Sequence, residues 1–306
     1  MTTALLTSTG LAYRVQGDPD GVPVVALHGT PGSRFSGTPA RDALHALGLR
    51  VVTYDRPGYG DSPAVEERTV RALAGDVEAV LDAAGVQGPV GVFAGSSGSA
   101  SALAFALARP ERVRALSLVW PLAPKVDEPG SPGMGEREWG VGMEEQQRAL
   151  HELTLRDPVL VRDQLELHLG REGGAAGIVA DMLQVQEPWD LDLAAVRGPV
   201  DLWWGTDSAV SPAGHAQWLA DRLTGAEVGA HPQEEHGWHV RRLVEVFALL
   251  GQRLGAQPRS PEELAAAAAM DVGGGGCGGD GCGMDRGDGT AGGCGTGGGC
   301  VCGATH

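Results

Sequence analysis

The sequence predicts an α/β fold, in which a mostly parallel central sheet is flanked by helices and one helical segment is inserted. Between residues 21 and 255, short apolar runs alternate with stretches whose apolar residues recur at helical spacing. The chain has 306 residues, 42% of them hydrophobic, so it is long enough to bury the two-sided core that such a sheet requires. One large domain with an insertion is therefore expected.

Five runs are predicted to be strands because they are short, rich in β-branched residues and bounded by turn residues. They are residues 22–27, 50–54, 89–93, 113–119 and 199–204. Five other stretches carry helical spacing and are predicted to be the crossover helices that connect parallel strands. They are residues 41–47, 69–84, 99–108, 213–223 and 240–254.

This alternation stops between residues 122 and 188. A stretch rich in proline and glycine, residues 124–135, precedes two segments of helical spacing at residues 139–155 and 159–169. We interpret residues 122–188 as a helical cap inserted into the core, which then consists of residues 1–121 and 189–258.

Residues 259–306 are predicted to be a linker followed by a disordered tail. Glycine dominates from residue 273 onward, so this tract carries too little apolar surface to fold. All five cysteines lie in it, and no disulfide can therefore connect parts of the core. Their irregular spacing matches no tetrahedral zinc site, and we predict no metal or other cofactor for the catalytic site. Binding of soft metal ions by these thiols, or their modification, is the alternative role for the tail.

The net charge of −16 argues against nucleic acid and anionic membranes as partners. A small molecule, neutral or cationic, is the expected partner, and the sequence pattern predicts no particular oligomeric state. The N-terminal residues show no secretory signal and no stretch approaches a membrane span, so we expect a cytoplasmic protein.

The candidate nucleophile is Ser97, in the segment Val92-Phe-Ala-Gly-Ser-Ser-Gly-Ser-Ala100 between a predicted strand and a predicted helix. A sharp strand-to-helix turn strains its central residue and needs small neighbours, here Gly95 and Ser99. The helix N-terminus points at the same place, so the amide of Gly98 is expected to donate to an oxyanion. A glycine–serine turn without chemistry is the alternative interpretation.

Two further loops follow predicted strands. Residues 27–33, Leu-His-Gly-Thr-Pro-Gly-Ser, would bring a second oxyanion donor, Thr30, to a bound carbonyl. Residues 55–62, Asp-Arg-Pro-Gly-Tyr-Gly-Asp-Ser, are expected to form a tight, hydrogen-bonded structural turn. Together with the turn at Ser97, these segments resemble the α/β-hydrolase superfamily, including its esterases and prolyl iminopeptidases, over about residues 11–254.

The resemblance implies an α/β-hydrolase fold with a helical cap, and it implies a general base after the last strand. His236 in Pro232-Gln-Glu-Glu-His-Gly-Trp-His239 lies where the family histidine would lie, and Gly237 follows it. Imidazole suits this position because it exchanges protons near neutral pH. His239 and His231 are the other histidines nearby.

The family acid normally follows the preceding strand in the pattern Gly-x-x-Asp, whereas this chain reads Gly205-Thr-Asp-Ser208. The resemblance therefore places Ser208 at the acid position and the candidate acid, Asp207, one residue earlier. The alternatives are a Ser–His dyad, an acid from elsewhere in the chain, or reduced hydrolytic activity.

The expected function is hydrolysis of a small-molecule ester or amide through an acyl-enzyme, with an ester favoured over a peptide because no peptide-binding subsite is recognisable. Trp120, Trp139 and Met143 are candidates for lining the substrate pocket, although such side chains are more often plain core. Two alternatives remain: a hydrolase-fold protein that binds a ligand or partner with little turnover, and a different reaction in the same pocket, such as C–C bond cleavage.

Overall fold

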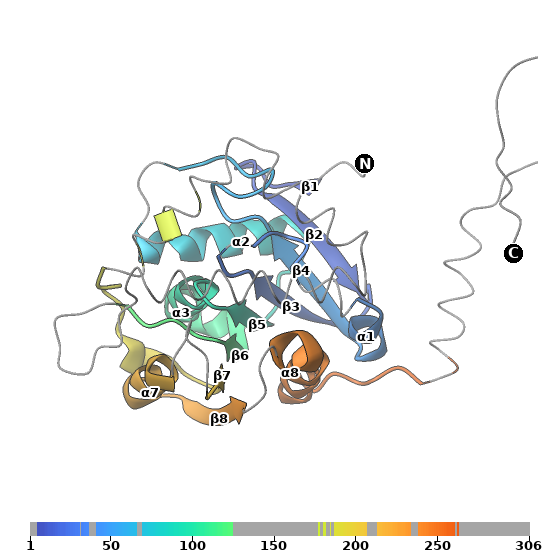
Figure 1. Cartoon of the computed structure of the whole chain (residues 1–306). Coiled ribbons are helices and arrows are strands. Elements are labelled where there is room, and N and C mark those ends of the chain that lie inside the picture. The colour runs from blue at the N-terminus through green and yellow to red at the C-terminus, as the bar shows by residue number, and fades with distance from the viewer. Residues whose placement is uncertain are drawn as a thin grey trace, which may run out of the picture. The chain divides into compact units, whose positions relative to one another are not determined.

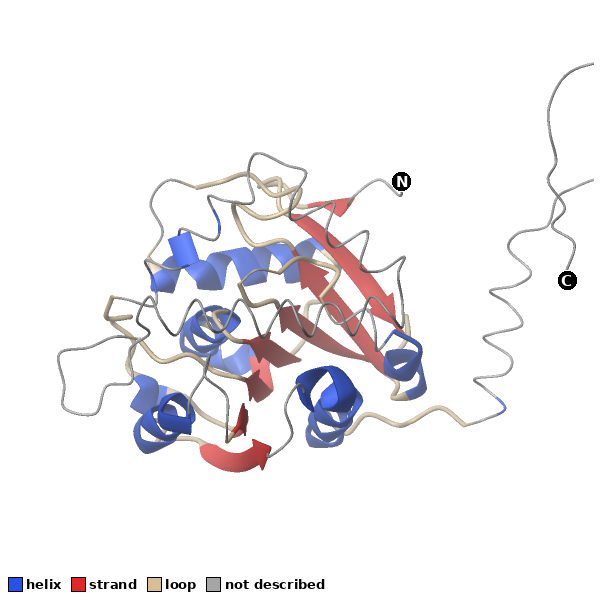
Figure 2. Ribbon diagram, in the orientation of Figure 1, coloured by secondary structure: helices blue, strands red, loops and turns tan. Residues whose placement is uncertain are grey.

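The computed structural model describes residues 5–30, 32–36, 41–65, 69–124, 177, 180–181, 184, 187–206, 213–233, 238–260 and 262. The chain divides into two compact units, Met1–Leu264 and Ala265–His306, and the second lies wholly outside these residues. The first unit is built around a sheet with helices on both faces (Figures 1 and 2).

The sheet has eight strands in the order β1-β2-β4-β3-β5-β6-β7-β8. Their bounds are β1 Leu5–Leu6, β2 Ala12–Gly17, β3 Val22–Leu27, β4 Leu49–Tyr54, β5 Val90–Gly95, β6 Val113–Val119, β7 Pro199–Gly205 and β8 Glu227–Gln233. The pairings of β1 with β2 and of β2 with β4 are antiparallel, and all others are parallel. The carboxyl ends of β3 to β8 therefore lie along one edge.

All five predicted strands and all five predicted crossover helices are present, with shifts of a few residues at their ends. The helices are α1 Arg41–Ala46, α2 Leu73–Ala83, α3 Gly98–Ala108, α7 Ala213–Arg222 and α8 Trp238–Leu254. The sequence reasoning did not specify β1, β2 or β8. These strands lie toward the two edges of the sheet, and β8 is partly exposed along its length, so none has the continuous apolar run of a central strand.

Alternate residues of the central strands serve two separate cores. Val25 of β3 packs with α2 and α3, whereas Val24 and Ala26 pack with α1 and α8 on the opposite face. On that second face the rings of Phe93 in β5 and Phe247 in α8 stack with centroids 4.8 Å apart. This two-sided burial is the physical reason why the strands read as apolar runs in the sequence.

Most of the expected cap and tail lie outside the described residues, so the boundaries proposed for them remain predictions. Arg259 is described, and it still contacts the core: its amide donates to the carbonyl of Ala46 at 2.9 Å and its guanidinium pairs with Asp18. No helix in the described ranges combines the length and apolar character needed to cross a membrane.

Candidate active site

The turn between β5 and α3 has its strained residue at Ser96. The φ angle of Ser96 is +49°, a left-handed conformation that is uncommon for a residue with a side chain. Ser97 has φ −59° and ψ −20°, which is ordinary helical backbone at the N-cap of α3. The expectation that Ser97 is the strained centre of this turn is therefore wrong by one residue.

The close contacts around the turn also indicate that Ser96, and not Ser97, is its central residue. A Cβ added to Gly98 would lie 2.8 Å from the carbonyl oxygen of Leu27 and 2.9 Å from that of His28. The nearest atom to a Cβ added to Gly95 would be the amide nitrogen of Gly29, at 3.9 Å. The residue that must be small is thus Gly98, two positions after Ser96, and not Gly95. The run Ala94-Gly-Ser-Ser-Gly-Ser99 allows two placements of a serine between small residues two positions away, one around Ser97 and one around Ser96, and packing distinguishes them.

Hydrogen bonds hold Ser96 in place at the edge of the sheet. Its amide donates to the carbonyl of Val119 at the end of β6, at 2.8 Å. Its carbonyl accepts from the hydroxyl of Ser99 at 2.7 Å, so Ser99 stabilises the turn in addition to being small. The loop after β3 lies directly against it, because a Cβ on Gly29 would come within 2.9 Å of the Ser96 Cβ.

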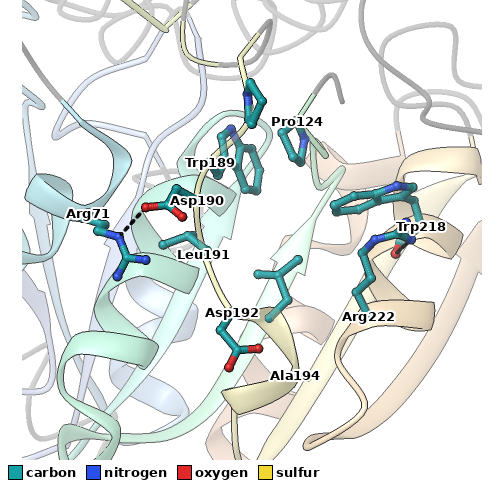
Figure 3. A pocket seen from close by; sticks show the side chains of 11 residues that line it. Arg71, Pro124, Trp189, Asp190, Leu191, Asp192, Ala194, Trp218 and Arg222 are labelled. Carbon is teal, nitrogen blue, oxygen red and sulfur yellow. Dashed lines mark hydrogen bonds and ion pairs between the residues drawn. The ribbon is translucent and has the colours of Figure 1, made fainter. Parts of the chain in front are cut away.

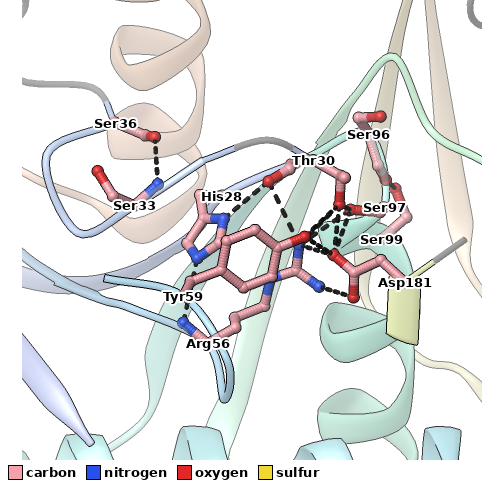
Figure 4. Close-up of polar contacts among 11 residues, drawn as sticks. His28, Thr30, Ser33, Ser36, Arg56, Tyr59, Ser96, Ser97, Ser99 and Asp181 are labelled. Atoms are coloured by element: carbon pink, nitrogen blue, oxygen red, sulfur yellow. Dashed lines mark hydrogen bonds and ion pairs between the residues drawn. The ribbon is translucent and has the colours of Figure 1, made fainter. Parts of the chain in front are cut away.

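The hydroxyl of Ser97 is engaged by side chains from neighbouring loops (Figure 4). Its Oγ lies 2.8 Å from the Thr30 hydroxyl and accepts from Nη2 of Arg56 at 3.0 Å. Oδ2 of Asp181 lies 3.5 Å away. Thr30 and Ser97, which the sequence predicted to share a site, are therefore in contact through their side chains.

Arg56 and Asp181 form a buried ion pair at this place. Nη1 of Arg56 donates to Oδ1 of Asp181 at 2.8 Å, and Nη2 donates to Oδ2 at 2.6 Å. Burial alone would lower the pKa of Arg56, but the adjacent carboxylate raises it overall. Burial, and next the negative charge of Asp181, raise the pKa of Tyr59, whose hydroxyl donates to Oδ2 of Asp181 at 2.5 Å.

The loop of residues 55–62 is tight and hydrogen-bonded, as expected. The Asp55 carboxylate accepts from the amides of Arg34 at 2.6 Å and Asp61 at 3.0 Å, and it pairs with the Arg34 guanidinium. The Ser62 hydroxyl donates to the Asp55 carbonyl at 2.6 Å. This scaffold directs Arg56 and Tyr59 toward Ser97, so the loop contributes to the site as well as to the fold.

Arg56, Tyr59 and Asp181 were missed by sequence reasoning. An arginine and a tyrosine in a loop at the carboxyl edge of the sheet were a signal that could have been used for the first two. Asp181 belongs to the inserted region, where no motif marks it.

Trp120 directly follows β6 at the same edge as Ser96, and its amide donates to the carbonyl of Trp203 at 2.7 Å. His231 lies within β8, where its ring stacks on Trp203 at 4.1 Å and Nε2 lies 2.9 Å from Asp201. The other predicted site residues, His236, Asp207, Trp139 and Met143, lie outside the described residues.

A pocket of about 500 Å³ opens between the segment of residues 188–194 and α7 (Figure 3). Trp189 and Trp218 line it, with the guanidinium of Arg222 lying 3.9 Å from the centre of the Trp218 ring. Its lining residues include neither Ser96 nor Ser97, so it is distinct from the serine turn.

Comparison with known proteins gives matches of three kinds. A family model described as alpha/beta hydrolase fold matches residues 22–173. A proline iminopeptidase of Neisseria gonorrhoeae is 41% identical over 109 residues, which make up 35% of this chain and 34% of that protein. This chain thus matches about a third of the length of that relative.

Two other similar proteins extend over more of the chain. The 2-hydroxy-6-oxononadienedioate/2-hydroxy-6-oxononatrienedioate hydrolase of Burkholderia vietnamiensis is 27% identical over 264 residues, covering 73% of this chain and 86% of that protein. The structure of the esterase RhEst1 from Rhodococcus sp. ECU1013 matches with a TM-score of 0.62 at 21% identity, covering 82% of this chain and 98% of that one.

Proposed function

Since the family model and the structural matches show that this chain has the α/β-hydrolase fold, we propose that it is a serine hydrolase of small-molecule esters with Ser96 as its nucleophile. The observation that carries the proposal is the left-handed backbone of Ser96 between β5 and α3, with Gly98 packed against the end of β3. Such a strained turn raises a serine hydroxyl at the carboxyl edge of a parallel sheet.

In the proposed reaction, the Ser96 Oγ attacks the ester carbonyl while His236 takes its proton and passes it to the departing alkoxide. Asp207 would orient His236 and stabilise its protonated form. Water, deprotonated by the same histidine, then attacks the acyl-enzyme; the acid is released and Ser96 regains its proton. Both partners lie outside the described residues, so their parts follow from the sequence resemblance alone.

The change of register also moves the oxyanion donors. The amide after the nucleophile now belongs to Ser97 in place of Gly98, and the Thr30 amide remains the second donor. The contacts of Thr30 and Arg56 with the Ser97 hydroxyl would hold that residue still while its amide binds the developing charge.

Relatives favour hydrolysis without choosing the substrate class. An iminopeptidase, esterases and a 2-hydroxy-6-oxononadienedioate/2-hydroxy-6-oxononatrienedioate hydrolase are among the similar proteins. We favour an ester because nothing in the described part of the site forms a peptide-binding strand edge or groove beside Ser96.

The test compares Ser96→Ala with Ser97→Ala, using short-chain p-nitrophenyl esters and a serine-reactive phosphonate whose attachment point is mapped by mass spectrometry. Loss of the attacking hydroxyl should lower kcat by about 10⁴-fold or more in Ser96→Ala and abolish labelling. Ser97→Ala should keep labelling at Ser96 and lose about 10- to 100-fold in kcat, because only the position of an oxyanion donor is disturbed.

Labelling at Ser97 would restore the assignment made from the sequence. No labelling and no turnover in the folded wild type would instead favour the binding protein with little activity. Asp207→Asn tests the displaced acid, and a loss of about 10⁴-fold in kcat is expected if Asp207 orients His236.

A further inference from the structure

A carboxylate stands at the centre of the polar cluster beside the serine turn. Asp181 accepts hydrogen bonds from both terminal nitrogens of Arg56 and from the hydroxyls of Tyr59 and Thr30, and the Ser97 hydroxyl lies 3.5 Å from its Oδ2 (Figure 4). We call the side chains of Thr30, Arg56, Tyr59 and Ser97 the carboxylate cradle. Arg56 binds the carboxylate through two parallel hydrogen bonds, the geometry in which a guanidinium recognises this group.

All members of the cradle come from loops of the core that follow β3, β4 and β5, whereas Asp181 comes from the inserted region between β6 and β7. The core holds the donors through contacts that do not involve Asp181. The Arg56 amide donates to Nε2 of His28 at 3.1 Å, and its Nη2 also reaches the Gly29 carbonyl at 3.3 Å. The His28 and Tyr59 rings meet edge to face at 4.8 Å. The cradle is therefore preorganised by the core.

Charge makes an anion necessary at this place. The Arg56 side chain is fully buried and that of Asp181 is 2% exposed, so the pair shares a site with little access to water. A buried guanidinium that loses its counterion is strongly unfavourable, so any group that displaces Asp181 must itself bring a negative charge to Arg56. Although the whole chain carries a net charge of −16, this position selects locally for a negative group.

We propose that the carboxylate cradle is a subsite for the free carboxylate of an acidic ester substrate or of an acidic product, and that Asp181 is an internal competitor occupying it in this structure. The subsite adjoins the serine turn, because two of its members contact the Ser97 hydroxyl. The assignment of substrate class rests on the proposed function, whereas the assignment of a carboxylate-binding site can be tested without turnover. It replaces the sequence-based expectation of a neutral or cationic ligand.

The simpler reading is that Arg56 and Asp181 only attach the inserted region to the core. Truncation of Asp181 leaves a carboxylate-sized gap beside Arg56, which acetate could refill under either interpretation, so thermal unfolding tests only whether the cradle binds a free carboxylate. The two interpretations differ in the substrates that react. A purely structural pair gives no preference for an ester with a free carboxylate, whereas a substrate subsite does.

The first experiment therefore measures thermal unfolding of Asp181→Ala in sodium acetate and in sodium chloride at equal ionic strength and pH. We expect the Tm of Asp181→Ala to be lower than that of the wild type. Acetate should restore part of this difference in Tm, with an effect that saturates at high acetate concentration. If acetate binds with a Kd of about 10 mM, then 100 mM acetate should raise Tm by about 3 °C relative to chloride.

Two variants serve as controls. Asp181→Asn fills the cradle with an amide of the same size and should show a smaller acetate response. Asp82→Ala removes the same charge from an exposed position on α2 and should unfold at the same temperature in both salts. An equal response of Asp181→Ala to acetate and chloride would overturn the carboxylate site.

The second experiment tests the substrate class in the intact chain with two esters of similar size, monoethyl succinate and ethyl butyrate. The kcat/KM for monoethyl succinate divided by that for ethyl butyrate should rise at least about tenfold in Asp181→Ala, because the internal competitor is gone. Adding Tyr59→Phe to Asp181→Ala should lower the ratio again about three- to tenfold, because one donor to the substrate carboxylate is removed when no internal competitor is present. Unchanged ratios in both variants would overturn the acidic-substrate assignment.

Failure of this inference and failure of the proposed function give different results. If no ester is hydrolysed but acetate selectively stabilises Asp181→Ala, the cradle stands and the esterase proposal falls. The opposite outcome is that esters are hydrolysed through Ser96 while Asp181→Ala shows neither a selective rise of Tm in acetate nor a higher relative kcat/KM for the succinate ester. That result supports the esterase proposal and contradicts the carboxylate cradle.

Discussion

Adding one methyl group at Gly98 should destabilise the protein, whereas the same change at Gly95 should not. The Cβ of Gly98→Ala would meet two backbone carbonyl oxygens of the β3 end at 2.8 and 2.9 Å. Backbone atoms cannot rotate away as a side chain can, so either β3 or the start of α3 must move. In Gly95→Ala the nearest atom is 3.9 Å from the new Cβ, which is ordinary contact.

The two substitutions should differ in sign as well as in size. Overpacking of a tight site costs about 1–3 kcal/mol, and alanine recovers about 1 kcal/mol over glycine in a helix, so Gly98→Ala should lower the free energy of unfolding by up to about 2 kcal/mol. Gly95→Ala should raise it by about 0.5 kcal/mol, because alanine restricts the unfolded chain.

The assay is equilibrium unfolding in guanidinium chloride followed by the fluorescence of the seven tryptophans. Ester turnover should fall in Gly98→Ala and change little in Gly95→Ala, because only the former displaces Ser96. If Gly95→Ala lowers the free energy of unfolding and Gly98→Ala leaves it unchanged, Ser96 is not the central residue of the turn, and the sequence-based assignment of Ser97 is favoured.

Three further predictions concern the fold around the site. Burial lowers the pKa of His215 to about 4, so the folded state favours its neutral form. The free energy of unfolding should therefore keep its full value above pH 6.5 and fall by about 3 kcal/mol as the pH is lowered to 4. His215→Gln, which can still accept from the Ala123 amide, should flatten this slope in urea titrations at several pH values. Ser62→Ala should cost about 2 kcal/mol in denaturant unfolding, because the Ser62 hydroxyl bonds buried backbone of Ala12 and residue 55; an unchanged midpoint would contradict this. Phe247→Ala should cost about 3–5 kcal/mol in the same assay, against about 0.5 kcal/mol for the exposed Val244→Ala on the same helix, and equal losses would refute the assigned core face.

The central strands could be predicted because a parallel sheet covered on both faces must be apolar at consecutive positions. Residues 22–27 and 113–119 show this directly, and both are strands in the structure. β8, which reads Glu-Val-Gly-Ala-His-Pro-Gln, lies at an edge and is partly exposed, so its residues carry no such pattern.

The loops of the site were located from the sequence, but the roles of their residues were not. Asp55 and Ser62 are structural, as expected, because their polar groups satisfy each other and nearby backbone amides. Arg56 in the same loop points the other way, into contact with Ser97. Spacing along a loop does not indicate side-chain direction, since irregular backbone has no fixed period.

The sequence by itself determined the class of fold and the edge of the sheet where chemistry can occur, because hydrophobic periodicity and small residues at turns are local properties of the chain. Only the tertiary structure decided which serine is strained, since that depends on how closely Gly98 approaches the carbonyls of another strand. It also brought Asp181 to Arg56 across 125 residues of sequence. A buried charge finds its counterion through space, and no local pattern of residues records such a pairing.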